Sequence, residues 1–148
     1  IISALEERGY KTQNLATDTG MWRKTNAKIK MLEWLEEFGN EIEVIIANND
    51  QMALGAIEAL GEMGYLDDTS TVIPVVGVDG LEPAVAAIKE GKMLGTVFNN
   101  ADKQARAIFT KGYYLATKNE PKVISSTSYH GKYLRTPYEI IQRNSKNQ

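Results

Sequence analysis

Short amide and carboxylate side chains follow each of three apolar segments of this chain. In order along the sequence they are Asn49 with Asp50, Asp79, and Asn99 with Asn100. A carboxylate accepts two hydrogen bonds from adjacent hydroxyl groups, and an amide accepts one while donating another. If the fold brings these groups together, they suit a polyhydroxylated ligand better than a phosphate. Each of them alone is also an ordinary helix N-cap or turn residue.

An aromatic side chain offers a second kind of contact. Trp22 lies near the start of a helical segment and close to the end of a short expected strand. An indole stacks against the C–H face of a sugar ring and excludes water from it. The alternative is that Trp22 is a core residue, as Trp34 is expected to be.

Alternating strands and helices would position these residues. Apolar, largely β-branched runs predict strands, and apolar residues at helical spacing predict helices. The expected strands cover 42–47, 72–78 and 93–98, and the expected helices cover 21–38, 52–63, 83–91 and 101–117. This order predicts an α/β fold with a mainly parallel sheet, in which ligands bind at the carboxyl ends of the strands.

The two ends of the chain are less regular. Residues 1–9 resemble the last turns of an amphipathic helix without an N-cap, so we expect further sequence to precede them. Short strands are expected at 11–16, 122–127 and 132–136. Residues 143–148 are polar enough to be disordered.

Composition narrows the classes of function. The 148 residues, 43% of them hydrophobic, suffice for about one globular domain. With 17 basic and 19 acidic side chains, the net charge of -2 provides no basic field for nucleic acid and no cationic face for a membrane. No apolar run approaches the roughly 20 residues that cross a bilayer, so direct membrane insertion is not expected.

Signals of enzymatic chemistry are weak. The absence of cysteine excludes disulfides, thiol catalysis and thiolate metal sites. The single histidine, His130, has no serine or carboxylate that the sequence assigns to it. Motifs of the GxSxG, Walker, HExxH and GxGxxG types are missing. We therefore expect a binding protein and not an enzyme.

Several segments together resemble the periplasmic D-galactose/D-glucose-binding protein family. The resemblance runs in order along the chain to about Tyr138. The segments that carry it are Asp18-Thr19-Gly20-Met21-Trp22, Ile42 to Ala56 with its Ala-Asn-Asn-Asp run, Pro74 to Leu81, Gly95 to Ala101, and Arg135-Thr136-Pro137-Tyr138.

The resemblance implies roles for individual residues. Asn49, Asp79 and Asn99 would hydrogen-bond sugar hydroxyls, and Trp22 would stack on one face of the pyranose. Glu43 would complete a structural calcium site, whose other ligands come in the family from an upstream loop outside this chain.

The resemblance also implies an architecture. This chain would be an incomplete, Rossmann-like parallel-sheet lobe of a type 1 periplasmic binding protein, with most of the first lobe missing. Residues 1–98 would form the second sugar-binding lobe, residues 99–138 the hinge crossings and elements that pack on the first lobe, and residues 139–148 a polar tail.

The function implied is that of a receptor. The protein would bind a hexose of galactose or glucose type in the cleft between two lobes, as the solute-binding component of a sugar ABC transporter or chemoreceptor system. Its partners would be a membrane permease or a chemoreceptor, in the periplasm or, in a Gram-positive bacterium, outside the cell on a lipid anchor. The alternative is the effector-binding core of a LacI-type transcriptional regulator, which would require a helix-turn-helix before residue 1.

Overall fold

The computed structural model describes residues 2–67, 72–118, 128–130 and 133–143. Within these ranges the elements are α1 (Ile2–Glu6), α2 (Lys24–Phe38), the 3-10 helix η1 (Gly39–Glu41), β1 (Ile45–Ile46), α3 (Asp50–Glu62), β2 (Val75–Asp79), α4 (Glu82–Lys89), β3 (Gly95–Phe98), α5 (Ala101–Thr117), β4 (Ser128–His130), β5 (Tyr133–Arg135) and β6 (Glu139–Gln142).

The main sheet has four strands in the order β1-β2-β3-β6. The first three strands run parallel, and β6 pairs antiparallel with β3. A separate antiparallel pair is formed by β4 and β5. The predicted α/β fold with a mainly parallel sheet is confirmed.

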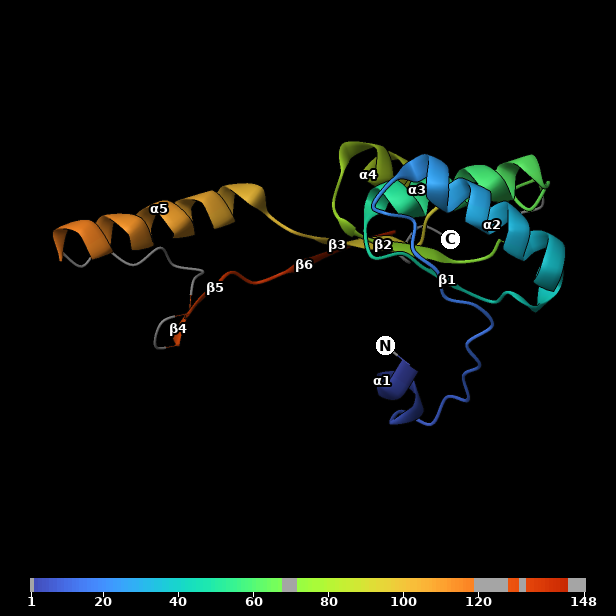
Figure 1. Ribbon diagram of the computed structural model, residues 1–148, viewed down its shortest axis with the longest axis horizontal. Coiled ribbons are helices and arrows are strands. Elements are labelled where there is room, and N and C mark those ends of the chain that lie inside the picture. Colours follow the sequence, from blue (N-terminus) through green and yellow to red (C-terminus); the bar gives the residue numbers. More distant parts are fainter. Residues whose placement is uncertain (1, 68–71, 119–127, 131–132, 144–148) are drawn as a thin grey trace.

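Helices α2, α3 and α4 lie on one side of this sheet (Figure 1). The largest fully buried apolar side chains come from α2 (Met31), α3 (Leu60) and β2 (Val75). Full burial of such a side chain contributes about 1.5–3 kcal/mol. In β2 the buried residues Val75 and Gly77 alternate with the half-buried Val76 and Val78, so one sheet face is the core face.

Proline sets the start of the central strand. Pro74 lies directly before β2, and its carbonyl accepts a hydrogen bond from the N–H of Ile45 at 2.9 Å. Proline has no N–H to donate within a sheet, so it occurs at strand starts. The strand predicted at 72–78 is present as the shorter β2, which begins after Pro74. The strand predicted at 42–47 is present as the shorter β1.

Two expectations for the less regular segments are wrong. Residues 11–16 form no strand: Leu15 is half-buried against the core, but polar side chains such as Gln13 and Asn14 are exposed, so the segment has no continuous apolar face. Residues 139–142, expected to belong to a polar tail, form β6 and pair with β3 through Ile140 and Ile141. The strand expected at 132–136 corresponds to β5, whereas residues 122–127 and 144–148 lie outside the described residues.

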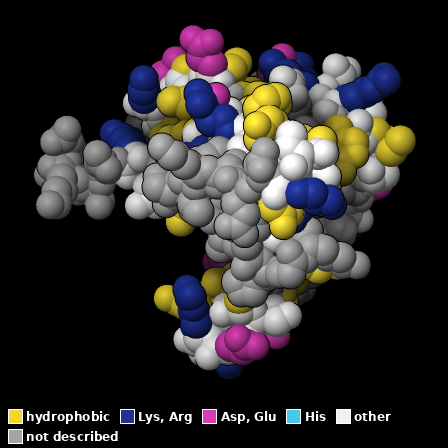
Figure 2. Space-filling model, turned by 90° about the vertical axis from the view of Figure 1, so that its left-hand side faces the viewer, with side chains coloured by type: hydrophobic (Ala, Val, Ile, Leu, Met, Phe, Trp, Pro, Cys, Tyr) yellow, Lys and Arg dark blue, Asp and Glu magenta, His cyan; other side chains and the backbone are white. Residues whose placement is uncertain are grey.

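Helix α5 extends away from the body of the molecule, and α1 stands apart below it (Figure 1). In α5 only Ala107 is buried, while Ile108 and Phe109 are 72% and 75% exposed. Seen from the α5 end, the surface carries hydrophobic side chains next to lysine and arginine (Figure 2). Much of the apolar surface of α5 therefore has no partner among the described residues.

Candidate functional site

The carboxyl ends of the parallel strands lie at one edge of the sheet. Asp79, the last residue of β2, is the register partner of Phe98, the last residue of β3. The N–H of Asn99 donates to the carbonyl of Asp79 at 3.2 Å. On the other side of β2, β1 leads into Asn49 within three residues. The structure thus brings Asn49, Asp79 and Asn99 to the same edge.

Asn49 links this edge to the tryptophan segment. Its Oδ1 accepts a hydrogen bond from the N–H of Met52 at 2.9 Å and so caps α3. Its Nδ2 donates to the backbone carbonyl of Trp22 at 3.5 Å. The alternative reading of Asn49 as a helix cap is therefore correct, and the same side chain also holds Trp22 near the strand ends.

Trp22 is an exposed residue on a strained turn. Its side chain is 64% exposed, whereas Trp34 is half-buried against the core, so the core alternative for Trp22 is wrong. The φ angles of Met21 and Trp22 are 50° and 61°. This left-handed region costs a non-glycine residue about 1–2 kcal/mol. The hydrogen bond from the N–H of Met21 to Oγ1 of Thr19, at 3.3 Å, helps to hold the turn.

Asp50 is completely buried, with 0% of its surface exposed. Its Oδ2 accepts from the backbone N–H groups of Gly80 and Leu81, both at 2.8 Å. Its Oδ1 accepts from the hydroxyl of Thr96 at 2.7 Å. Sequence reasoning placed Asp50 at a strand end and did not single out Thr96. No local pattern would have revealed their pairing, because the two residues are 46 positions apart.

Asp79 is half-buried beside this network. Burial, followed by the negative charge of Asp50, raises the pKa of the Asp79 carboxyl, while a hydrogen bond from the Asp50 backbone acts in the opposite direction. The backbone of Asp79 has a φ of 122°, which L side chains rarely adopt. Asp79 is thus held at the sheet edge in a strained conformation.

The two asparagines after β3 have different partners. Oδ1 of Asn99 accepts a hydrogen bond from Nε2 of Gln104 in the first turns of α5. Oδ1 of Asn100 accepts from the N–H of Lys103 at 3.0 Å and caps α5. Asn100 therefore has a structural role, whereas Asn99 lies next to Asp79 and near the edge where the other polar groups meet.

The assembled edge can bind hydroxyl groups on one side. It presents a carboxylate (Asp79), two amides (Asn49 and Asn99) and an exposed indole (Trp22). One hydrogen bond joins Asn49 to the backbone of Trp22, and another joins the backbones of Asp79 and Asn99. A carboxylate and amides offer both acceptors and donors, and the indole offers an apolar face. This combination suits a polyol or sugar.

Glu43 lies apart from this edge. It is exposed and precedes β1. Among the described residues no group of three or more histidine, aspartate or glutamate side chains could hold a metal ion. A calcium ion takes six to eight oxygen ligands, and the other ligands are expected outside this chain, so the role of Glu43 as a calcium ligand stays a prediction.

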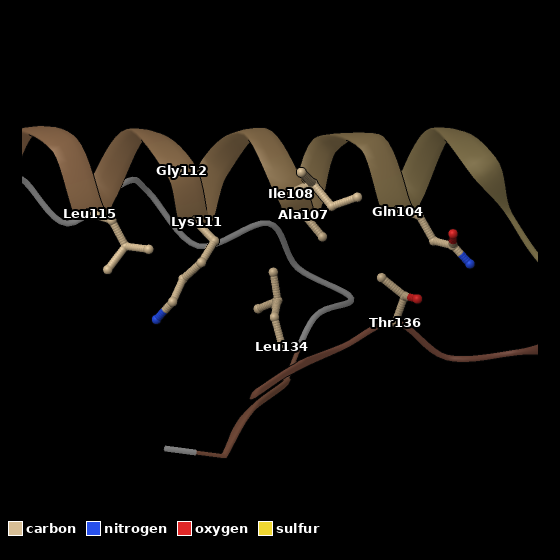
Figure 3. Close-up of a pocket in the computed structure, with 8 residues that line it drawn as sticks. All are labelled: Gln104, Ala107, Ile108, Lys111, Gly112, Leu115, Leu134 and Thr136. Carbon is tan, nitrogen blue, oxygen red and sulfur yellow. The ribbon is translucent and has the colours of Figure 1, made fainter. Parts of the chain in front are cut away.

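A cavity of about 470 Å³ lies along α5, away from most of the strand-end residues. Figure 3 shows Leu134 of β5 pointing toward α5, with Thr136 facing Gln104. The lining of the cavity is mostly apolar and includes Ala107, Ile108 and Leu115.

None of the described helices is long and apolar enough to cross a membrane.

Comparisons with known proteins agree with this arrangement. Residues 1–120 match the model of a family described as a periplasmic binding protein domain. The chain is 35% identical over 146 residues to the D-galactose/methyl-galactoside binding periplasmic protein of Haemophilus influenzae, covering 98% of this chain and 42% of that protein. It is 40% identical over 93 residues to a xylitol-binding protein of Mycolicibacterium smegmatis, covering 63% of this chain and 25% of that protein.

A solved structure gives the same result. The chain resembles an ABC transporter solute-binding protein from Bacillus halodurans with bound myo-inositol, at a TM-score of 0.69 and 32% identity, over 88% of this chain and 40% of that one. The chain spans less than half of the length of these relatives. All three are binding proteins by their descriptions, in agreement with the expectation of a binder. This chain belongs to the periplasmic binding protein domain family.

Proposed function

We propose that this chain provides one wall of a hexose-binding site, of galactose or glucose type, in the solute-binding component of a sugar ABC transporter or chemoreceptor system. One observation carries the proposal: Asn49, Asp79, Asn99 and the exposed Trp22 meet at a single sheet edge. Parallel-sheet proteins bind their ligands at such an edge. The protein acts as a receptor and not as an enzyme.

The ligands of the relatives support a polyhydroxylated molecule. One relative is described as binding D-galactose and methyl-galactoside, another xylitol, and the third holds myo-inositol. These three ligands share adjacent hydroxyl groups and differ in ring and chain. The carboxylate of Asp79 can accept hydrogen bonds from two adjacent hydroxyls, which is a feature that all three ligands offer.

Each site residue has a distinct role in the proposal. Asp79 fixes a pair of hydroxyls, while Asn49 and Asn99 each exchange hydrogen bonds with one hydroxyl. Trp22 stacks on the C–H face of a pyranose, since its indole is exposed and its backbone is held near the edge by the turn and by the hydrogen bond from Asn49. A pyranose has such a face, whereas an open-chain polyol does not hold one rigidly.

The other wall of the cleft comes, in this proposal, from a first lobe outside this chain. The relatives are more than twice as long as the part that this chain matches. Ligand contacts from both lobes would favour a closed state, and a permease or chemoreceptor in the membrane would recognise the closed form. The proposed location is the periplasm, or the outer cell surface on a lipid anchor.

Isothermal titration of the full-length protein tests the function. We expect saturable heat with galactose or glucose, and weaker or no heat with xylitol and myo-inositol. The absence of heat with every simple hexose would overturn the hexose assignment. Binding of xylitol or myo-inositol alone would replace the hexose by another polyol.

A further inference from the structure

The residue directly beneath the proposed sugar contacts is a buried carboxylate. Asp50 is fully buried at the carboxyl ends of β1, β2 and β3, where its two oxygens take hydrogen bonds from three donors. A buried carboxylate is tolerated only where such donors replace water. Asp50 cannot contact a ligand itself while it is covered, so its role must act through the residues that it holds.

The Asp50 carboxylate lies at the N-terminal ends of two helices, α3 and α4. Asp50 is the first residue of α3, and its side chain accepts from the N–H of Leu81, which precedes the first residue of α4. Leu81 has no side-chain oxygen with which to cap α4. Because helix N-termini attract negative charge, the Asp50 carboxylate supplies the capping acceptor that the start of α4 lacks.

The neighbouring backbone is shaped around the same carboxylate. A Cβ atom on Gly77 would lie 2.4 Å from Oδ1 of Asp50, so only glycine fits at this position in β2. Gly80 has a φ of +78°, and its N–H donates to Asp50. The residue directly before Gly80, at the end of β2, is Asp79, whose φ of 122° is strained. Strained residues persist where their surroundings fix them, and here the Asp50 hydrogen bonds do so.

We infer that Asp50 is a positioning residue of the sugar site: it fixes the Gly80-Leu81 backbone and so aims the side chain of Asp79 at the ligand. This inference rests on the proposed sugar-binding function. Asp50 acts on Asp79 in two ways: its carboxylate fixes the backbone that follows Asp79, and its own backbone donates a hydrogen bond to the Asp79 carboxyl. The hydroxyl of Thr96 on the adjacent strand holds the Asp50 carboxylate in place.

Substitutions of Asp50 in the full-length protein test the inference. Asp50→Ala removes the acceptor, while Asp50→Asn keeps an oxygen for the Gly80 and Leu81 N–H groups and removes the charge. Leu60→Ala is the matched control, because it weakens the core at the other end of α3, about 15 Å away at the rise of a helix. Titration calorimetry with the preferred hexose is run at temperatures where circular dichroism shows each variant folded.

We expect Asp50→Ala to bind the hexose at least about tenfold more weakly, because a lost hydrogen bond to a charged group has that order of effect. Leu60→Ala should bind as the wild type does. Asp50→Asn should stay within about threefold of the wild type at neutral pH. Its affinity should persist to somewhat lower pH: burial, the larger cause of the raised pKa of Asp79, remains, but the negative charge of Asp50, the second cause, is gone.

Two results would overturn the inference: wild-type affinity in folded Asp50→Ala, or an unshifted acid limit of binding in Asp50→Asn. If Asp50→Ala does not fold, the pH profile of Asp50→Asn decides alone. A wild-type protein that binds no hexose would instead show that the proposed function is wrong.

Discussion

The protonation state of Asp79 determines how many hydrogen bonds it can accept from the hydroxyl groups of the proposed ligand. Its carboxyl is half-buried and faces the charge of Asp50, and both raise its pKa. An ionised carboxylate accepts two hydrogen bonds from hydroxyls, whereas the protonated acid loses part of that capacity. A raised pKa means that protonation begins at a higher pH than for an ordinary aspartate.

We therefore expect hexose affinity to fall on acidification before the pH reaches the usual aspartate range, near about 4. The measurement is titration calorimetry of the full-length protein from about pH 7 to about pH 4. Asp79→Asn serves as the comparison, since an amide does not titrate. It should bind about 10- to 100-fold more weakly at neutral pH, with a flat profile over this range. Equal pH dependence of the wild type and Asp79→Asn would contradict the role of this carboxyl.

Trp22 allows binding to be separated from stability. Its indole is 64% exposed, so its removal leaves no cavity in the core. We expect Trp22→Ala to weaken hexose binding about tenfold or more, because the apolar face for the sugar ring is lost. The free energy of unfolding should change by no more than about 0.5 kcal/mol. Trp22→Phe keeps an aromatic face and should restore most of the affinity, as calorimetry would measure. Wild-type affinity in Trp22→Ala would remove the residue from the site.

At the scale of elements, periodicity located most strands and helices. Runs of β-branched residues marked β1, β2 and β3, and the apolar spacing marked α2 to α5, because these elements bury one face against a common core. β6 was not predicted, because none of its residues is fully buried and its sequence therefore lacks the pattern of a core strand. Its position in the sheet comes from antiparallel pairing with β3. The edge residues Asn49, Asp79 and Asn99 were likewise predictable from their positions after strands.

Other parts of the site depend on contacts between distant elements. Asp50 meets Gly80, Leu81 and Thr96 across 30, 31 and 46 positions. Its burial follows from the sheet register, which a local pattern does not specify. The exposed position of Trp22 also depends on a turn with two residues in the left-handed region, which sequence spacing does not reveal.

The packing of β2 against α3 yields a prediction with an internal control. Gly77→Ala would place a methyl group 2.4 Å from Oδ1 of Asp50 and 2.8 Å from Cε of Met93. We expect it to lower the free energy of unfolding by about 1–3 kcal/mol or more, through overpacking. Gly112→Ala in α5 meets nothing within 4 Å and should instead stabilise the chain by about 0.5–1 kcal/mol. Chemical denaturation measures both. A neutral Gly77→Ala would mean that β2 and α3 can separate at little cost.

At the scale of the whole molecule, apolar surface is distributed unevenly. One face of the main sheet is covered by α2, α3 and α4, whereas Ile46 on β1 is 42% exposed (Figure 1). Ile108, Phe109 and Leu115 on α5 are more exposed still. Parallel sheets normally have both faces covered, and contiguous apolar surface marks an interface. In the proposed two-lobed receptor, the first lobe covers α5.

The same substitution in two contexts tests this packing. Phe109 is 75% exposed, so Phe109→Glu should leave the stability of this chain within about 0.5 kcal/mol of its parent. In the full-length protein, where we propose that α5 packs on the first lobe, it should destabilise by about 2 kcal/mol or more, since a charge would be buried. Thermal unfolding of both proteins provides the comparison. Equal effects in the two would show that α5 has no partner in the full-length protein.

The division of the cleft between two lobes also limits what this chain can bind. Closure adds contacts from a second wall and excludes water, so one wall retains only part of the binding free energy. Trp22, Asn49, Asp79 and Asn99 form an open edge, where hydroxyl groups of a sugar keep most of their water. We therefore expect the isolated chain to bind hexoses with a dissociation constant above about 1 mM. This corresponds to a binding free energy less favourable than about −4.1 kcal/mol. Chemical-shift titration of the isolated chain, with the full-length protein as the positive control, measures the difference. Millimolar or tighter binding by the isolated chain would place the whole recognition surface on this lobe.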